Sequence, residues 1–192
     1  GEYLYDLAKN ELGFDVTNAQ FTEKVGTRFL FVYFDQDKER SFTNYKGSRS
    51  DLMIEASELD LSQIRRCKVF NYTPLSFEFD YPIAKAAELA LAEAHSAGVM
   101  TAFDSNYRFP YEDMKVYHAV QDAIYSAQIL KLSQDDIRYF MKEENVFSAC
   151  EKLLAGNAKI VAFTMGTSGS LLYTHKGWSY RPAYRVNALD TT

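Results

Sequence analysis

The chain has 192 residues, and its 47% hydrophobic and 24% charged residues are typical of one globular domain with a sizeable core. A formal net charge of −5 argues against a general nucleic-acid binder, which needs a basic surface. No apolar run is long enough to cross a bilayer, and the first residues lack the layout of a signal peptide. We therefore expect a cytoplasmic protein with no nucleic-acid partner and no membrane partner.

The cysteines and histidines favour neither a disulfide framework nor a zinc site. Cys67 and Cys150 lie far apart and belong to no Cys-x-x-Cys pair, which favours free thiols in a reducing cytosol. The histidines lack the spacing of metal ligands: His95, His118 and His175.

The first predicted elements in chain order are a helix and a pair of strands. Apolar side chains recur at helical spacing over 2–12, and Gly13 follows as a glycine that ends the helix. Residues 28–34 are aromatic and β-branched, and 40–45 alternate in polarity, so a charged turn joins two strands that end at Gly47. This pair holds too little apolar material for the centre of a sheet. We expect an edge hairpin or a small lid sheet.

From residue 68 onward, predicted strands and helices alternate. Such alternation is typical of a parallel sheet covered by helices. The predicted strands are short and apolar: 68–72, 99–103, 129–132, 160–163 and 170–173. The predicted helices are 57–64 with Ser57 as N-cap, 81–97, 117–126, a helix that begins after Ser133, and 148–155.

Polar clusters follow four of these strands, at 73–76, 104–108, 131–136 and 164–169. Because ligands in open α/β sheets bind outside the carboxyl ends of the strands, the four clusters predict one crevice. Each cluster alone also has a purely structural explanation. The arginine of 104–108 either binds an anion with its planar fork or pairs with a surface acid. The acids after Ser133 suit the start of any helix.

Four short motifs occur in a fixed order: Asp-Ser-Asn-Tyr-Arg at 104–108, Lys-Leu-Ser-Gln-Asp-Asp at 131–136, Thr-Met-Gly-Thr-Ser-Gly at 164–169 and Asp-Thr-Thr at 190–192. Together they resemble the PfkB (ribokinase-like) carbohydrate kinases, especially the fructokinase and 2-keto-3-deoxygluconate kinase branch. The resemblance covers most of the chain. It implies an α/β fold with a ribokinase-like three-layer α/β/α core, a mostly parallel sheet and a small β lid. It also implies one incomplete kinase domain over 1–192 with the lid hairpin at 26–47.

In this family ATP phosphorylates a sugar hydroxyl, so the resemblance implies ATP and Mg²⁺ as cofactors, with K⁺ as a candidate monovalent cation. The positions that match the ATP site are Lys131, Ser133, Thr164, Gly166 and Gly169. Those that match the substrate and phosphate site are Asn106, Arg108, Tyr45 and Lys46, and the implied metal ligands are Asp136 and Asp190. Three positions depart from the family pattern: Ser105 replaces a proline, Ser133 an asparagine and Asp136 a glutamate.

The family's catalytic base is the last residue of Asp-Thr-Thr-Gly-Ala-Gly-Asp, and this chain carries the first three residues of that motif at 190–192. We therefore expect no catalytic residue within the chain, because the catalytic Asp would lie beyond Thr192. The chain starts without Met, and we expect it to be truncated or incomplete at both ends. The Gly-Ala-Gly backbone that would form the anion hole is expected beyond Thr192 as well.

The function implied by the resemblance is ATP-dependent phosphorylation of a sugar, most simply fructose. Lys46 lies near the position where keto-deoxygluconate kinases favour an arginine, and lysine lacks the bidentate fork for a carboxylate. The alternatives are 2-keto-3-deoxygluconate kinase and an inactive kinase-like binding or regulatory protein. A Rossmann dehydrogenase fits less well, because no Gly-x-Gly-x-x-Gly follows a strand. The expected partners are the sugar and ATP, with a possible second subunit bound through the lid.

Overall fold

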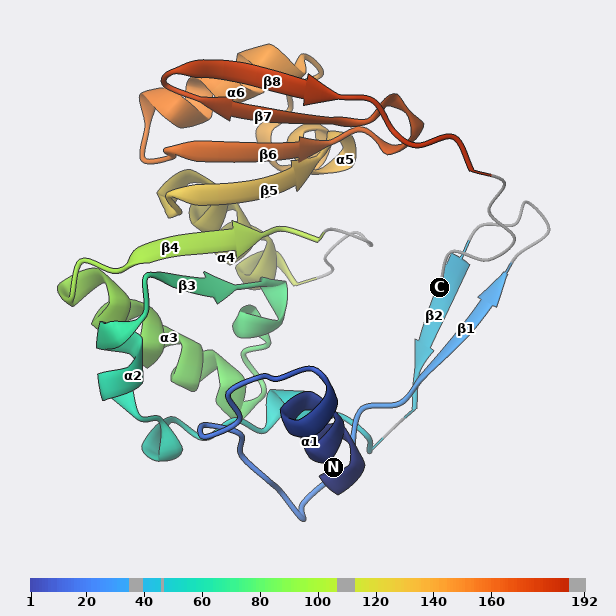
Figure 1. Ribbon diagram of the computed structural model, residues 1–192, viewed down its shortest axis with the longest axis vertical. Coiled ribbons are helices and arrows are strands. Elements are labelled where there is room, and N and C mark those ends of the chain that lie inside the picture. The colour runs from blue at the N-terminus through green and yellow to red at the C-terminus, as the bar shows by residue number, and fades with distance from the viewer. Residues whose placement is uncertain (35–39, 46, 107–112, 187–192) are drawn as a thin grey trace.

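The structure is a computed structural model that describes residues 1–34, 40–45, 47–106 and 113–186. Its strands form one six-stranded sheet and one separate two-stranded sheet (Figure 1). The order in the large sheet follows the chain: β3 (Val69–Tyr72), β4 (Met100–Asp104), β5 (Ile129–Ser133), β6 (Ile160–Thr164), β7 (Ser170–Thr174) and β8 (Gly177–Arg181). The predicted α/β fold with a mostly parallel sheet is therefore confirmed.

Strands β3 to β6 are parallel, and helices connect them. The connecting helices are α3 (Pro82–Ser96), α4 (Met114–Ser126), the short α5 (Gln134–Asp136) with a π-helical continuation (Ile137–Met141), and α6 (Val146–Ala155). The chain then turns back, so that β7 and β8 add two antiparallel strands at one edge. We did not predict β8, which is exposed along its whole length and includes Trp178 and Tyr180.

Helices cover one face of the large sheet. Alternate side chains of β4, β5 and β6 are buried, and they pack with apolar side chains of α4 and α6 in one core. The largest of these sheet residues are almost fully buried: Phe103, Leu130, Leu132 and Phe163. The side chains between them point to the other face, where they are half-buried or exposed. Asp104, Lys131 and Thr164 belong to this second set.

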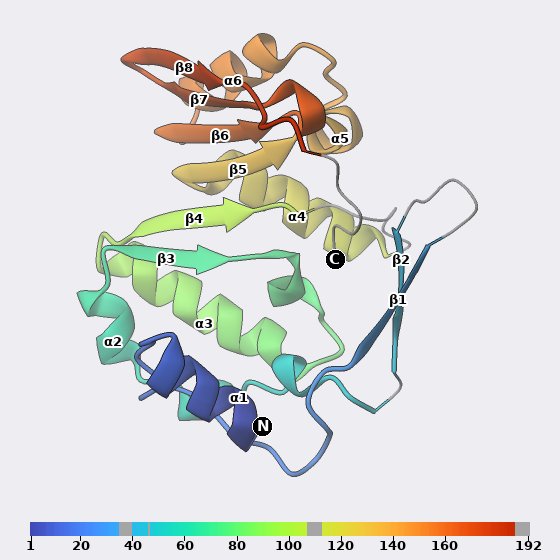
Figure 2. The same ribbon diagram turned by 45° about the vertical axis from the view of Figure 1, so that its right-hand side comes forward.

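The first part of the chain forms the predicted helix and hairpin. Helix α1 (Glu2–Asp6) continues as a π-helical turn (Leu7–Glu11), and Gly13 has a φ of +67°. Strands β1 (Leu30–Phe34) and β2 (Arg40–Asn44) pair in antiparallel register. In both views the hairpin lies beyond the carboxyl ends of the parallel strands β3 to β6 (Figures 1 and 2).

Several predicted helix starts are wrong, and the reason is the same in each case. The helix predicted over 57–64 is a 3-10 turn (Ala56–Glu58) followed by α2 (Leu61–Arg66), with Asp60 rather than Ser57 as N-cap. Helices α4 and α6 also begin earlier than predicted, after Asp113 and Asn145. In all three helices an Asp or Asn side chain accepts a hydrogen bond from a backbone N–H of the first turn.

Candidate nucleotide and sugar site

The loop after β4 is attached to β5 at Lys131. Asp104 and Lys131 are register partners, and the Lys131 Nζ lies 3.1 Å from the Asp104 Oδ1. The same oxygen accepts a hydrogen bond of 3.1 Å from the backbone N–H of Asn106. Asn106 adopts a left-handed φ of +37°, which asparagine tolerates better than most residues. These contacts tie two predicted site residues to Asp104: Asn106 on the loop after β4 and Lys131 in the middle of β5.

Ser133 and Asp136 form a full capping box at the start of α5. The backbone N–H and the hydroxyl of Ser133 both donate to Asp136 Oδ2 at 2.6 Å, and the Asp136 N–H donates back to Ser133 Oγ at 3.4 Å. Asp136 is 1% exposed, and its second oxygen, Oδ1, is buried without a hydrogen-bond partner among the described residues. The predicted capping box is confirmed, and the second carboxylate oxygen is buried without a partner among the described residues.

The turn from Thr164 to Gly169 follows β6. Thr164 is the register partner of Ser133, and its Oγ1 donates to the Leu132 carbonyl at 3.3 Å. A 3-10 turn (Gly166–Ser168) then leads to Gly169, whose φ is +96°. A Cβ at Gly169 would overlap the carbonyl oxygen of Arg181 and lie 2.9 Å from the Pro182 Cα. Gly169 is therefore required by the close approach of the chain that leaves β8.

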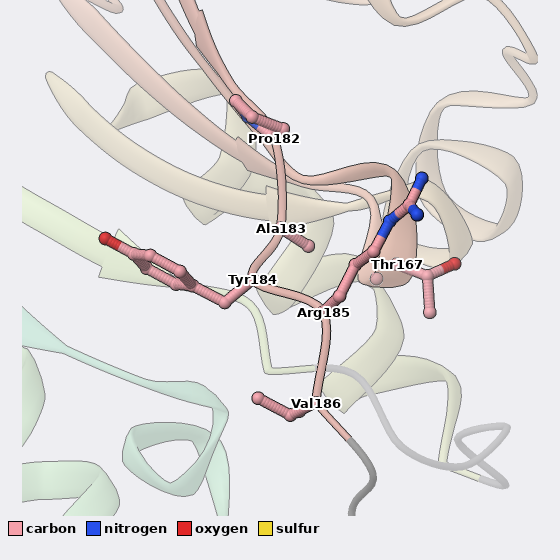
Figure 3. A pocket seen from close by; sticks show the side chains of 7 residues that line it. Thr167, Pro182, Ala183, Tyr184, Arg185 and Val186 are labelled. Atoms are coloured by element: carbon pink, nitrogen blue, oxygen red, sulfur yellow. The ribbon is translucent and has the colours of Figure 1, made fainter.

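A cavity of about 770 Å³ lies beside the turn. The residues that line it come from the turn and from the segment after β8: Gly166, Thr167, Pro182, Ala183, Tyr184, Arg185 and Val186 (Figure 3). In the close-up, Tyr184 and Arg185 point in opposite directions from the backbone, with Arg185 on the side of Thr167. Thr167 lies within the predicted 164–169 cluster, whereas the segment 182–186 was not predicted as part of the site. The proline directly after an aromatic strand was the only signal for the segment.

The strand register brings most of the predicted site residues to one edge of the sheet. Asp104 pairs with Lys131, and Ser133 pairs with Thr164, so the ends of β4, β5 and β6 meet there. Tyr45 lies on the hairpin instead, where its N–H donates to Phe29 and its carbonyl accepts from the Ser48 hydroxyl. Three predicted residues lie outside the described part of the chain: Arg108, Lys46 and Asp190.

The described residues contain neither a cluster of metal ligands nor a membrane-spanning helix. Outside the gaps at 35–39, 46, 107–112 and 187–192, no group of three or more His, Cys, Asp or Glu side chains is placed to hold a metal ion. Within those same ranges, no helix has both the length and the apolar character needed to span a bilayer.

Comparison with known proteins gives matches over nearly the whole chain. Fructokinase-2 of Oryza sativa subsp. japonica is 29% identical over 201 residues, which cover 100% of this chain and 57% of that protein. Probable fructokinase-5 of Arabidopsis thaliana is 28% identical over 199 residues, which cover 100% of this chain and 60% of that protein. The chain thus spans less than two thirds of the length of these relatives.

Solved structures share the fold. The fructokinase from Xylella fastidiosa with bound ATP has a TM-score of 0.79 at 23% identity, and the match covers 98% of this chain and 59% of that one. This likeness confirms the predicted ribokinase-like fold class. The family model described as "pfkB family carbohydrate kinase" matches residues 2–192 of this chain. The chain therefore belongs to the pfkB family of carbohydrate kinases.

Proposed function

We propose that the protein carrying this chain transfers the γ-phosphoryl group of ATP to a hydroxyl of a sugar, with fructose as the preferred acceptor. The observation that carries the proposal is the strand register, which places Asp104 beside Lys131 and Ser133 beside Thr164 at one edge of the sheet. The family match and the names of the fructokinase relatives support the choice of reaction and of sugar.

Phosphoryl transfer needs positioning and neutralisation of negative charge more than covalent chemistry. Lys131 supplies a positive charge at the sheet edge, and its side chain is 42% exposed. The turn after Thr164 supplies glycines that let backbone N–H groups approach a phosphate closely. We assign the nucleotide to the cavity beside this turn, because Gly166 and Thr167 line it. Asn106 and Arg108 are assigned to the sugar and the transferred phosphate.

Mg²⁺ is the metal that this reaction requires, and Asp136 fits a role in holding it. Mg²⁺ prefers oxygen ligands and usually keeps several of its waters. Asp136 Oδ2 is engaged in the capping box, whereas Oδ1 is buried and has no partner among the described residues. That oxygen suits a hydrogen bond to a metal-bound water. When bound, the metal would neutralise phosphate charge. Asp190, which lies outside the described residues, is the proposed partner in metal or K⁺ binding.

The hairpin is proposed to act as the lid of this site and as a contact between two subunits. All five residues of β1 are exposed, including Leu30 at 41% and Phe34 at 47%. An isolated two-stranded sheet is marginally stable in water, so a second copy would stabilise it by covering one face. Sedimentation of the complete protein at micromolar concentration tests the dimer. A monomer would overturn the dimer and leave the kinase proposal standing.

The test of the reaction uses the complete protein with ATP and Mg²⁺. Release of ADP should depend on added fructose and should be faster with fructose than with 2-keto-3-deoxygluconate. Faster turnover of the sugar acid would reassign the substrate. Binding of ATP without ADP release in the presence of any sugar would favour an inactive kinase-like protein.

The cytoplasmic location also remains a proposal, supported by the two free cysteines.

A further inference from the structure

The end of β4 and the middle of β5 are joined by more contacts than the sheet itself provides. Ser105 is fully buried, and both its backbone N–H and its hydroxyl point to one acceptor, the Lys131 carbonyl, at 3.3 and 3.4 Å. A proline at this position would lack the N–H donor. The serine thus holds the backbone of the loop against the backbone of Lys131.

Asp104 adds a side-chain connection to this backbone one. Its Oδ1 is the shared acceptor of the Asn106 N–H and the Lys131 ammonium group, each at 3.1 Å. The first contact closes a local turn that favours the left-handed conformation of Asn106. The second restrains a long and flexible side chain. One carboxylate oxygen therefore contacts one group on the loop after β4 and one group on β5.

We propose that Asp104 is a positioning residue that sets Asn106 and Lys131 relative to each other, so that the group facing the sugar and the group facing the nucleotide are correctly spaced. The inference rests on the proposed sugar kinase activity. Asp104 acts through its two neighbours and is not itself assigned a contact with either substrate. Because the Asp104 and Lys131 side chains are 38% and 42% exposed, their ion pair adds little to stability, and variants should fold.

Two substitutions at this position separate the two contacts. Asp104→Asn keeps an oxygen acceptor for the Asn106 N–H and loses the charge that holds Lys131. We expect its KM for ATP to rise about tenfold and its KM for fructose to stay within about twofold of wild type. Asp104→Ala loses both contacts, so we expect both KM values to rise and kcat to fall by about tenfold or more.

A double variant tests whether Asp104 affects the KM for ATP through Lys131. If Asp104 acts through Lys131, the double variant Asp104→Asn with Lys131→Met should have the same KM for ATP as Lys131→Met alone. Asp122→Asn is the matched control, because Asp122 is exposed on α4 and far along the chain from the β4 end. It should match wild type in every constant.

These experiments distinguish failure of the positioning role of Asp104 from failure of the proposed kinase activity. An active wild-type protein whose Asp104→Asn variant has an unchanged KM for ATP overturns the positioning role alone. Equal effects of Asp104→Asn and Asp104→Ala on both substrates would also overturn it, since the two contacts would then not be separable. A wild-type protein that transfers no phosphoryl group to any sugar overturns the kinase activity, and the positioning role falls with it.

Discussion

Strands β1 and β5 both have five residues, but β1 is exposed along its whole length whereas alternate side chains of β5 are buried. The sequence of β1, Leu-Phe-Val-Tyr-Phe, is entirely apolar or aromatic, yet every residue is exposed. The sequence of β5, Ile-Leu-Lys-Leu-Ser, includes two polar residues, yet Leu130 and Leu132 are fully buried. A strand's own hydrophobicity therefore does not decide its burial in this protein.

The connections of the strands account for the difference. Each parallel pair in the large sheet needs a crossover, and the crossovers supply α3, α4 and α6 as a layer over one face. Because β1 and β2 are antiparallel, their pairing needs no crossover helix. The large sheet is held by its helical layer, whereas the hairpin depends on contacts at its base and on whatever binds its faces.

The largest expected effect is a matched pair of Leu→Ala substitutions in the complete protein. Leu130→Ala should lower the free energy of unfolding by about 2–5 kcal/mol, because the residue is fully buried and its truncation leaves a cavity in the apolar core. Leu30→Ala should cost at most about 1 kcal/mol, because Leu30 is 41% exposed. Urea unfolding measures both. Equal losses would mean that the hairpin is covered in solution.

In the turn after β6, replacing Gly169 with alanine should destabilise the fold more than replacing Gly166. Gly169→Ala should cost about 3 kcal/mol, because a φ of +96° is strained for alanine and the Cβ would overlap Arg181. Gly166→Ala should cost only about 1 kcal/mol, because its φ of +53° is left-handed and no atom lies within 4 Å of the added Cβ. Thermal unfolding distinguishes them, and a milder effect at Gly169 would show that the segment after β8 can move.

The base of the hairpin should show a smaller and local effect. Ser48 is buried, and its hydroxyl accepts from the Phe29 N–H at 3.1 Å and donates to the Tyr45 carbonyl at 2.9 Å. Ser48→Ala should cost about 1–2 kcal/mol. The loss should appear as faster hydrogen exchange at the Phe29 amide, with the amides of β5 unchanged.

The control for this substitution is Ser179→Ala, which changes an exposed serine of β8. It should alter no exchange rate at the hairpin base. If Ser48→Ala instead weakened the large sheet and the hairpin equally, the two regions would unfold as one unit.

Three features could be predicted from the sequence: the parallel sheet, the order of its elements, and the position of the site at the carboxyl ends of the strands. Periodic apolar runs separated by caps and glycines are local signals, and polar residues at strand ends mark that position. The capping box at Ser133 was visible for the same reason, since its partners lie three residues apart. The role of Gly13 in ending the first helix was also a local prediction, and its φ of +67° is consistent with that role.

What could not be predicted depends on contacts between distant segments. The need for glycine at Gly169 comes from Arg181, which only the folded chain brings near it. The double role of the Asp104 carboxylate requires the register of β4 against β5, which no short motif contains. Strand β8 is a different case, because Trp178 and Tyr180 alternate with small or polar residues and this local strand signal was overlooked.

The smallest expected effect concerns Glu143, in the loop that leads into the helical layer at α6. Its carboxylate accepts from the Lys152 ammonium group at 2.5 Å, the Ser148 hydroxyl at 2.8 Å and the backbone N–H groups of Glu144 and Asn145 at 3.0 Å. These donors, with Lys152 contributing most, lower the pKa of Glu143 from 4.5 to about 2.

A depressed folded-state pKa stabilises the fold when the group is ionised, so the contribution of Glu143 is complete above about pH 4.5 and disappears as the pH falls through 2. Glu143→Gln removes this part of the acid dependence, and the variant's stability should therefore converge with that of wild type near pH 2. Urea unfolding between pH 7 and pH 2 measures it, with Glu88→Gln as the control, because Glu88 has an exposed ion pair with Lys85. A Glu143→Gln curve parallel to wild type at all pH values would show that the loop before α6 is as loosely held as the hairpin, and the contrast between the two regions would then be confined to the sheet itself.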